Sequence, residues 1–358
     1  MNYAERQLKL LTLLKSHSLD ALLVRKKENI FYLTGARGDD AILLVSDRGA
    51  FLISDSRYKE EYEKSAKNCK FQIAKHKSFY SCIEGICAKK RLQRIGFESN
   101  NFSYSEHVSL KKRLKGKKLL PVKKIVESLR IIKDTEEIKH IRRACKDGCE
   151  TMNYALGIMR PGLSERWIKN RIECYVLEKG LEGTSFETIV ASGKNASMPH
   201  ARTSEKNIRK GEGVILDLGT INQRYNSDLT RTVFLGRIDR KYRRIYNIVR
   251  DAQKKAIEHI KPGIEASYID NISRQYISHK GLGRYFIHSL GHGIGLETHE
   301  DPSISRNSCN MLQKNMVITI EPGIYIPGWG GIRIEDVALV TKDSCDILTS
   351  ACRKVLCR

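Results

Sequence analysis

The chain repeats the start of one helical segment, first as Arg160-Pro-Gly-Leu163 and then as Lys261-Pro-Gly-Ile264. The two segments end alike, in Tyr175-Val-Leu-Glu-Lys-Gly-Leu181 and Tyr276-Ile-Ser-His-Lys-Gly-Leu282, and they align without a gap at an offset of 101 residues (Tyr175 to Tyr276). A Pro-Gly turn at the start and a Gly at the end are typical of a bounded helix. Two copies are too few for a solenoid. The repeat therefore predicts one domain made of two related halves.

Each repeat is followed by a strand that ends in a carboxylate. Val214-Ile-Leu-Asp217 ends at Asp217, and Val317-Ile-Thr-Ile-Glu321 ends at Glu321. Each strand then turns back into a return strand with a further carboxylate, Asp228 in the first half and Glu335 in the second. Because the halves are related, we expect the two hairpins to bring these four carboxylates to one centre.

Four carboxylates in a core cannot all stay ionised without compensation. A glycine-flanked histidine, His292, lies between the two halves within His288-Ser-Leu-Gly-His-Gly-Ile-Gly. Carboxylates with one imidazole favour Mn²⁺, Co²⁺ or Fe²⁺ over a thiolate zinc site. Two metals about 3.5–4 Å apart can hold a hydroxide and polarise the carbonyl that it attacks. The pattern predicts a hydrolase, with amide hydrolysis the first candidate; four unrelated, solvated acids are the competing interpretation.

Residues 1–122 predict a smaller α/β domain that serves as a scaffold or in oligomerisation. Its pattern indicates a helix over 4–16, strands over 21–24 and 94–98, and a hairpin over 41–53. We expect a linker at Leu119-Leu-Pro-Val122 and a catalytic domain over 123–358. We expect Ser128 to Ile158 to be mostly helix, with Asp134-Thr-Glu-Glu137 as an N-terminal capping signal ahead of Ile138.

Composition narrows the function classes. The formal net charge is +23, but the densest basic run, residues 111–118, lacks interleaved aromatics, so we expect no specific nucleic-acid binding. The ten cysteines form no C-x-x-C pair, which favours reduced thiols. No apolar run reaches membrane-spanning length and no secretory segment opens the chain, so we expect a cytoplasmic protein without membrane contact.

Taken together, these motifs resemble the pita-bread metallopeptidases, specifically the Xaa-Pro aminopeptidase and Xaa-Pro dipeptidase (prolidase) group, over nearly the whole length. The N-terminal half resembles the creatinase-type N-terminal domain in Tyr-Leu-Thr-Gly35 and Asp55-Ser-Arg-Tyr58. The catalytic half carries Pro199-His200, Ser227-Asp-x-Thr-Arg-Thr, His288-x-x-Gly-His-Gly-Ile-Gly, Thr298-His-Glu-x-Pro302, Glu321-Pro-Gly-Ile-Tyr and Gly331-Ile-Arg-Ile-Glu-Asp336. The resemblance implies an α+β fold, in which a pita-bread domain of two pseudo-symmetric halves follows a smaller creatinase-type domain.

The resemblance also implies roles by position. Asp217 would chelate one metal, His292 and Glu321 the other, and Asp228 and Glu335 would bridge both. Glu321 would also handle protons. His299 would hydrogen-bond the scissile carbonyl or its oxyanion. Four further residues would shape the pocket: His200 and His288 on the proline side, Arg333 as a brace for the bridging carboxylates, and Phe186 as an apolar wall.

The implied reaction is removal of the N-terminal residue from peptides with proline in second position, by attack of a metal-bound hydroxide on the Xaa-Pro carbonyl. The implied cofactor is two divalent ions per subunit, with Mn²⁺ first and Co²⁺ or Zn²⁺ as alternatives, and the family is usually homodimeric. Prolidase is the alternative activity; it must bind the free carboxylate of a dipeptide, and spacing alone assigns no arginine to that task. Methionine aminopeptidase, creatinase and a non-catalytic pita-bread binding module rank lower.

Overall fold

The computed structural model describes residues 1–74 and 78–352. The chain divides into two compact units, Met1–Arg130 and Ile131–Arg358, and each is considered by itself. Among the described residues, no helix is both long and apolar enough to cross a membrane. None of the cysteines in this part of the chain forms a disulfide.

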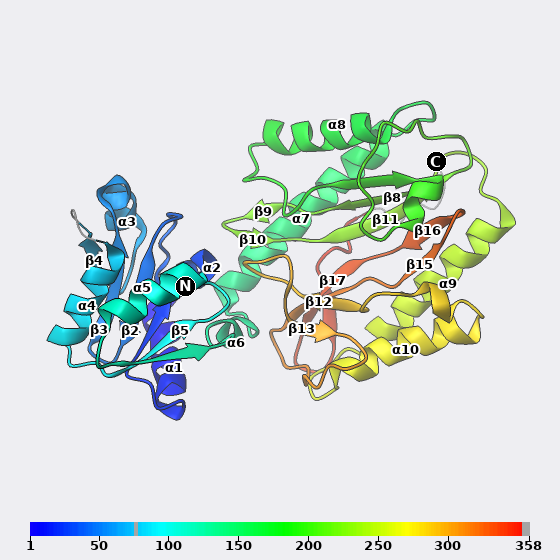
Figure 1. Cartoon of the computed structure of the whole chain (residues 1–358). Coiled ribbons are helices and arrows are strands. Elements are labelled where there is room, and N and C mark those ends of the chain that lie inside the picture. Colours follow the sequence, from blue (N-terminus) through cyan, green and yellow to red (C-terminus); the bar gives the residue numbers. More distant parts are fainter. Residues whose placement is uncertain (75–77, 353–358) are drawn as a thin grey trace. The chain divides into compact units, whose positions relative to one another are not determined.

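The N-terminal unit is a mixed sheet with helices on it (Figure 1). Its strands lie in the order β4-β3-β2-β1-β5-β6. Alternate apolar residues of the strands, such as Leu23 and Leu44, pack with Ile83 and Leu110 of the covering helices. The strands are Ala21–Val24 (β1), Ile42–Ser46 (β2), Gly49–Ser54 (β3), Lys70–Ile73 (β4), Arg94–Glu98 (β5) and Lys118–Val122 (β6). The helices are Tyr3–Ser16 (α1), Lys27–Thr34 (α2), Lys59–Ser65 (α3), Phe79–Lys89 (α4), Tyr104–Arg113 (α5) and Glu127–Arg130 (α6).

The prediction of a linker at residues 119–122 is wrong. These residues lie in strand β6, which pairs in parallel with β5 and lies at the edge of the sheet. Pro121 lies within this strand, which is possible because an edge strand tolerates proline. The N-terminal unit also extends through α6, because Val126 is buried and Arg130 donates from Nη1 to Asn29 Oδ1 at 2.6 Å. The following long helix, α7 (Thr135–Ile158), begins at the predicted cap, Asp134, which forms a capping box with Glu137.

The C-terminal unit shows the predicted repeat in its helices. Helix α8 (Glu165–Glu178) and helix α10 (Ala266–His279) occupy equivalent positions in the two copies. Gly162 and Gly263, in the preceding turns, have φ values of 92° and 82°. Gly180 and Gly281, just after the helices, have φ values of 67° and 79°. Only glycine adopts this backbone region at little cost, which explains why the Pro-Gly and Lys-Gly pairs recur.

Two sheets carry the halves of this unit. One has the order β11-β8-β7 and the other β13-β12-β14-β17-β18, while β9-β10 and β15-β16 form short hairpins. The strands are Ile189–Ser192 (β7), Gly213–Leu218 (β8), Ile221–Asn222 (β9), Tyr225–Asn226 (β10), Leu229–Phe234 (β11), Gly291–Gly293 (β12), Glu300–Ile304 (β13), Val317–Ile320 (β14), Gly323–Ile326 (β15), Gly330–Arg333 (β16), Asp336–Val340 (β17) and Cys345–Ile347 (β18).

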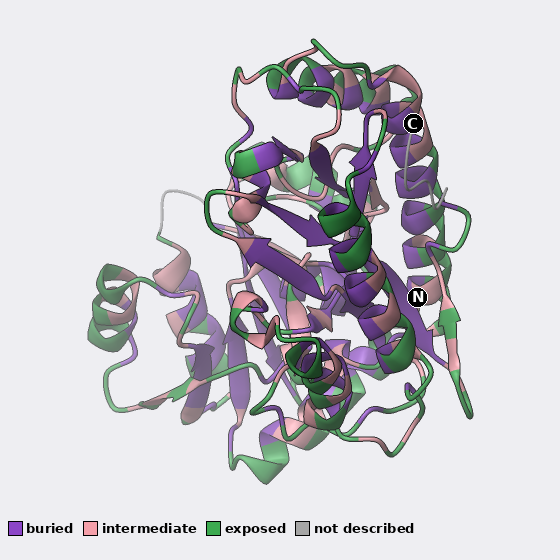
Figure 2. Cartoon of the chain, turned by 90° about the vertical axis from the view of Figure 1, so that its right-hand side faces the viewer, coloured by how far each residue is buried: buried purple, intermediate pink, exposed green. Residues whose placement is uncertain are grey.

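Helices cover these sheets from outside. Helices α7 and α8 pack on the first sheet, where Met152 and Ile172 contact Val214 and Leu216 in one apolar cluster. Helices α9 (Arg240–Ile257) and α10 pack on the second, in a cluster that includes Val249 and Ile318. Figure 2 shows the central strands buried and the helices exposed along their outer faces. This arrangement leaves the ends of β8, β11, β14 and β17 to build the site.

Candidate metal centre

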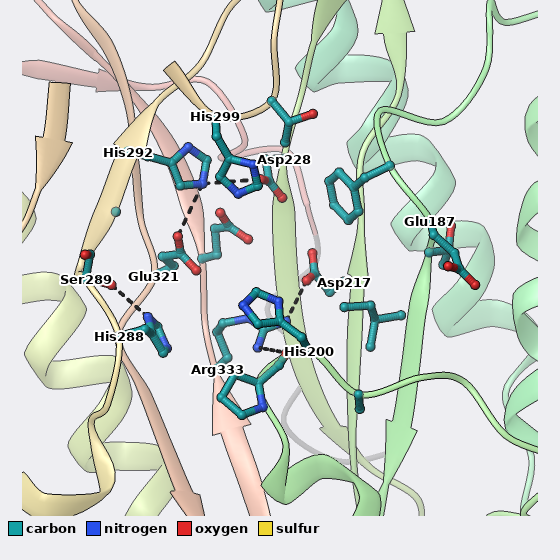
Figure 3. Close-up of a pocket in the computed structure, with 18 of the residues that line it drawn as sticks. Glu187, His200, Asp217, Asp228, His288, Ser289, His292, His299, Glu321 and Arg333 are labelled. Atoms are coloured by element: carbon teal, nitrogen blue, oxygen red, sulfur yellow. Dashed lines mark hydrogen bonds and ion pairs between the residues drawn. The ribbon is translucent and has the colours of Figure 1, made fainter. Parts of the chain in front are cut away.

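The four predicted carboxylates come together with His292. Asp217 lies in β8, Asp228 directly precedes β11, Glu321 directly follows β14, and Glu335 directly precedes β17. Figure 3 shows the labelled members pointing into one pocket. This pocket has a volume of about 570 Å³ and is lined by all five predicted ligands and by Phe186, His200, His288, His299 and Arg333. All the residues that the sequence singled out therefore border one cavity.

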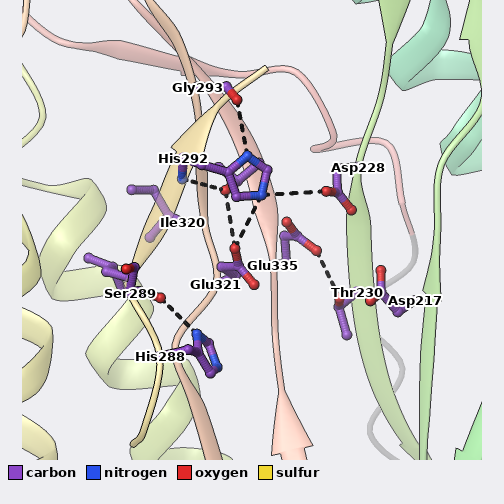
Figure 4. A network of polar contacts seen from close by, with 12 residues as sticks. Asp217, Asp228, Thr230, His288, Ser289, His292, Gly293, Ile320, Glu321 and Glu335 are labelled. Carbon is purple, nitrogen blue, oxygen red and sulfur yellow. Dashed lines mark hydrogen bonds and ion pairs between the residues drawn. The ribbon is translucent and has the colours of Figure 1, made fainter. Parts of the chain in front are cut away.

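His292 is oriented as a ligand. Its Nδ1 lies 3.0 Å from the carbonyl oxygen of Gly293, which favours the tautomer with the proton on Nδ1. The lone pair of Nε2 then faces Glu321 Oε1 at 3.4 Å and Asp228 Oδ2 at 3.7 Å (Figure 4). Burial lowers the pKa of His292 to about 4, so the ring is neutral. A neutral nitrogen aimed at two carboxylates fits a shared cation.

Three carboxylate oxygens lack a protein partner. Within the described residues, Asp217 Oδ1, Asp228 Oδ1 and Glu335 Oε1 are buried and accept no hydrogen bond. Buried polar atoms without a partner are rare and point to an ion or another unplaced group. Asp228, His292 and Glu335 each offer a ligand atom within 4.8 Å of the others. The donor set therefore fits divalent metal.

The electrostatics of the cluster favour the same conclusion. Burial, followed by repulsion from Glu335, raises the pKa of Asp228 well above its ordinary value, and the same two causes act on Glu321. Burial, followed by repulsion from Asp217, raises the pKa of Glu335 to about 8. Without cations the cluster retains protons at neutral pH. Divalent ions bound there would replace those protons and offset the repulsion between the carboxylates.

Arg333 and Thr230 hold the carboxylates from behind. Arg333 donates from Nη2 to Asp217 Oδ2 at 2.6 Å and from Nε to Thr230 Oγ1 at 3.1 Å. Thr230 in turn donates to Glu335 Oε2 at 2.8 Å. The motifs implied that Arg333 braces Asp228 and Glu335, but its direct carboxylate partner is Asp217, and it reaches Glu335 only through Thr230. Sequence reasoning gave Thr230 no role, although strand alternation from Asp228 indicates that it faces the same side.

Tyr325 is the second residue that the sequence left without a role. Its buried hydroxyl lies 2.8 Å from Arg333 Nη1 and 3.0 Å from His288 Nε2. His288 Nδ1 lies 2.7 Å from the carbonyl oxygen of Ser289, and burial lowers the pKa of His288 to about 4. The neutral ring therefore donates from Nδ1, and Tyr325 donates to Nε2 while it accepts from Arg333. Both nitrogens of His288 are engaged within the protein.

The remaining histidines face the open side of the pocket. His299 lies beside His292, with ring centroids 4.3 Å apart, and burial lowers its pKa. His200 is exposed at the pocket wall, in the loop between β7 and β8. Both are positioned to contact a bound molecule.

Comparison with known proteins decides the family. Residues 139–342 match the metallopeptidase family M24, and residues 6–132 match the creatinase/prolidase N-terminal domain. The chain belongs to metallopeptidase family M24. It is therefore a peptidase, a hydrolase that binds divalent metal, and the predicted combination of pita-bread and creatinase-type domains is confirmed.

Similar proteins share nearly its full length. An Xaa-Pro dipeptidase from Pyrococcus horikoshii is 38% identical over 357 residues, which cover 98% of this chain and 99% of the relative. The structure of an Xaa-Pro dipeptidase from Bacillus anthracis matches with a TM-score of 0.96 at 34% identity and covers 100% of both chains. That of an X-Pro aminopeptidase from Thermotoga maritima matches with a TM-score of 0.89 at 31% identity, over 95% of this chain and 98% of that one.

Proposed function

We propose that this M24 metallopeptidase is an Xaa-Pro dipeptidase, which hydrolyses dipeptides whose second residue is proline. The cluster of four carboxylates and His292, with unpartnered oxygens on three of them, carries the proposal. The relatives support the dipeptidase over the aminopeptidase that the sequence placed first, because the curated relative and the structure with the higher TM-score are both dipeptidases. The aminopeptidase stays as the second candidate because the Thermotoga maritima structure is also similar.

We assign the metal ligands as the motifs imply. Asp217 would hold one ion, His292 and Glu321 the other, and Asp228 and Glu335 both. When bound, two divalent ions supply a nucleophile from water at neutral pH and polarise the scissile carbonyl. Mn²⁺ is our first candidate, since oxygen-rich ligands suit a hard ion.

The protein's own groups complete the reaction. Glu321 would accept a proton from the attacking water and pass it to the prolyl nitrogen, which has no N–H of its own and leaves once protonated. His299 would donate to the carbonyl oxygen as negative charge develops there. His200 would orient the substrate, and Phe186 would offer an apolar wall to the prolyl ring. His288 would act through its hydrogen bonds to Tyr325 and Ser289, which fix the pocket wall.

The subunit organisation and the cell compartment stay predictions. We expect a homodimer in which the N-terminal domain serves as scaffold, and a cytoplasmic location. Sedimentation equilibrium of the full chain tests the dimer, and a mass of one chain would contradict it.

Substrate length tests the proposed activity. Metal-stripped protein is reloaded separately with Mn²⁺, Co²⁺ and Zn²⁺, and hydrolysis of Ala-Pro is compared with that of Ala-Pro-Ala. We expect Ala-Pro to be cleaved at a kcat/KM at least about tenfold higher, which corresponds to about 1.4 kcal/mol of transition-state binding. Preference for the tripeptide would establish the aminopeptidase instead. No cleavage of either peptide with any of the metals would refute both.

A further inference from the structure

A dipeptidase needs a cation for the free carboxylate of its substrate. In an Xaa-Pro dipeptide, this carboxylate lies one residue beyond the scissile carbonyl, and one residue spans at most about 3.6 Å. The group that binds it must therefore line the same pocket as the metal ligands. Among the described residues, two arginines and no lysine line that pocket, namely Arg202 and Arg333.

Arg333 is already bound to other groups of the protein. It is buried, and its guanidinium donates to Asp217, Thr230, Tyr325 and the carbonyl oxygen of Pro199. Turning it toward a substrate would leave Asp217 without its positive partner inside the core.

Arg202 is different, because its side chain is exposed and enters no hydrogen bond or ion pair within the described part of the protein. The backbone on both sides is fixed. Ala201 is buried in a small apolar cluster with Ile215, and Thr203 Oγ1 accepts a hydrogen bond from the backbone N–H of Val190 at 3.0 Å. Because these neighbours are anchored, a ligand that binds Arg202 would cost little backbone entropy in the loop.

Glu187 lines the same pocket, so its carboxylate could compete with a substrate carboxylate for Arg202. Its carboxylate is bonded to Lys169, and that bond is the largest cause of the lowered pKa of Glu187. Arg202 adds only a weaker, longer-range attraction to Glu187. Glu187 therefore has its own partner, and the charge of Arg202 remains open to a ligand.

We propose that Arg202 binds the free C-terminal carboxylate of the dipeptide substrate and so sets the preference for dipeptides over longer peptides. A guanidinium matches a carboxylate with two parallel N–H donors, a geometry that a lysine ammonium cannot reproduce. The assignment rests on the proposed dipeptidase activity and adds its specificity residue, a residue with no part in metal binding.

The test compares an acid with its amide. Steady-state kinetics are measured for Ala-Pro and for alanyl-prolinamide, with metal-loaded wild type, Arg202→Ala and Arg202→Lys. We expect Arg202→Ala to raise the KM for Ala-Pro about tenfold, the size of one charge-assisted hydrogen bond, with little change in kcat. The KM for the amide should not change, and Arg202→Lys should fall between. The matched control is Arg209→Ala, which removes an exposed arginine of the same loop that lies outside the pocket.

Two results would overturn the assignment: an equal rise in KM for acid and amide in Arg202→Ala, or the same loss of discrimination in Arg209→Ala. Calorimetry of Ala-Pro and alanyl-prolinamide binding to the metal-loaded proteins separates failure of the Arg202 assignment from failure of the proposed dipeptidase activity. If Ala-Pro binds more tightly than its amide only when Arg202 is present, yet is not cleaved, the dipeptidase proposal fails, and Arg202 is shown to bind a carboxylate without setting substrate preference. If Ala-Pro is cleaved and Arg202→Ala discriminates like wild type, the assignment fails alone.

Discussion

Arg333 shows how one side chain organises a charged site. It binds Asp217 directly and Thr230 beside Glu335, and it orients Tyr325 against His288. A lysine would present its donors from a single nitrogen and could not reach acceptors on both sides. The predicted brace therefore depends on the planar fork of arginine, beyond its charge.

We predict that Arg333→Lys lowers kcat/KM by about 10- to 100-fold, the usual effect of losing a group that orients metal ligands. Metal content should fall as well, because Asp217 and Glu335 lose their fixed orientation. Kinetics on Ala-Pro and elemental analysis of the purified variant measure both effects. Arg237→Lys, at an exposed position, is the control and should behave as wild type. Unchanged kinetics in Arg333→Lys would show that charge alone suffices.

Asp228 carries a second prediction at this scale. Its Oδ1 is buried without a partner, and its Oδ2 faces His292. Asp228→Asn keeps the shape but removes the charge, so we expect bound metal to fall by at least half and kcat/KM by at least about a thousandfold. Asp343→Asn, an exposed carboxylate elsewhere in the unit, is the control. Full metal content together with wild-type activity in Asp228→Asn would exclude Asp228 as a ligand.

At the scale of elements, glycines allow close approach of the backbone segments that carry the proposed ligands. Gly291 precedes His292 in β12, and a Cβ there would lie 1.9 Å from the carbonyl oxygen of Thr319 in the neighbouring strand β14. Gly219 repeats this in the first half, where a Cβ would lie 1.9 Å from the carbonyl oxygen of Ser227. These close approaches explain why glycine stands directly before His292 and two residues after Asp217.

We predict that Gly291→Ala separates β12 from β14 and destabilises the protein by at least about 2 kcal/mol, as overpacking does. The loss in kcat/KM should exceed what the lower free energy of unfolding accounts for, because His292 moves with the strand. Denaturant unfolding and hydrolysis of Ala-Pro measure the two effects. Gly157→Ala is the matched control, since its Cβ meets no atom within 4 Å, and in helix α7 it should stabilise by about 0.5–1 kcal/mol. Equal behaviour of the two variants would contradict the role given to Gly291.

At the scale of the whole molecule, the buried carboxylates couple stability to metal and pH. Glu335 has its pKa raised to about 8 in the folded state, from an ordinary 4.5. A raised folded pKa contributes stability below the unfolded pKa, and that stability is lost as pH rises through the folded value. His288 and His292, lowered to about 4, act oppositely, but only below their ordinary 6.5. Between pH 6.5 and 8 these two histidines therefore do not oppose the effect of Glu335 on stability.

We predict that the Tm of metal-stripped protein falls by at least about 3 °C between pH 6.5 and pH 8, equivalent to roughly 1 kcal/mol for a unit of this size. Metal-loaded protein should not show this fall, because the ions compensate the carboxylates at every pH in the window. Calorimetric scans of both forms across the window provide the comparison. Parallel pH profiles would mean that the cluster is not the site of metal binding.

The sequence by itself determined the two-half architecture, the start of α7 at Asp134, and the family to which the metal ligands belong. These features depend on local signals, since a cap, a Pro-Gly turn and a strand that ends in a carboxylate each lie within a few residues. We predicted a linker where the chain forms strand β6. Proline is compatible with both a linker and an edge strand, and only strand pairing distinguishes them.

The tertiary structure alone decided which polar atoms meet. Arg333 and Asp217 are separated by 116 residues in sequence, and Thr230 and Glu335 by 105, so no local pattern encodes those bonds. The same holds for Arg202, whose neighbours in sequence are anchored while its own side chain lines the pocket. Contacts between distant residues follow from how the two halves pack, and packing fixes which charges are compensated within the protein and which remain open to metal or substrate.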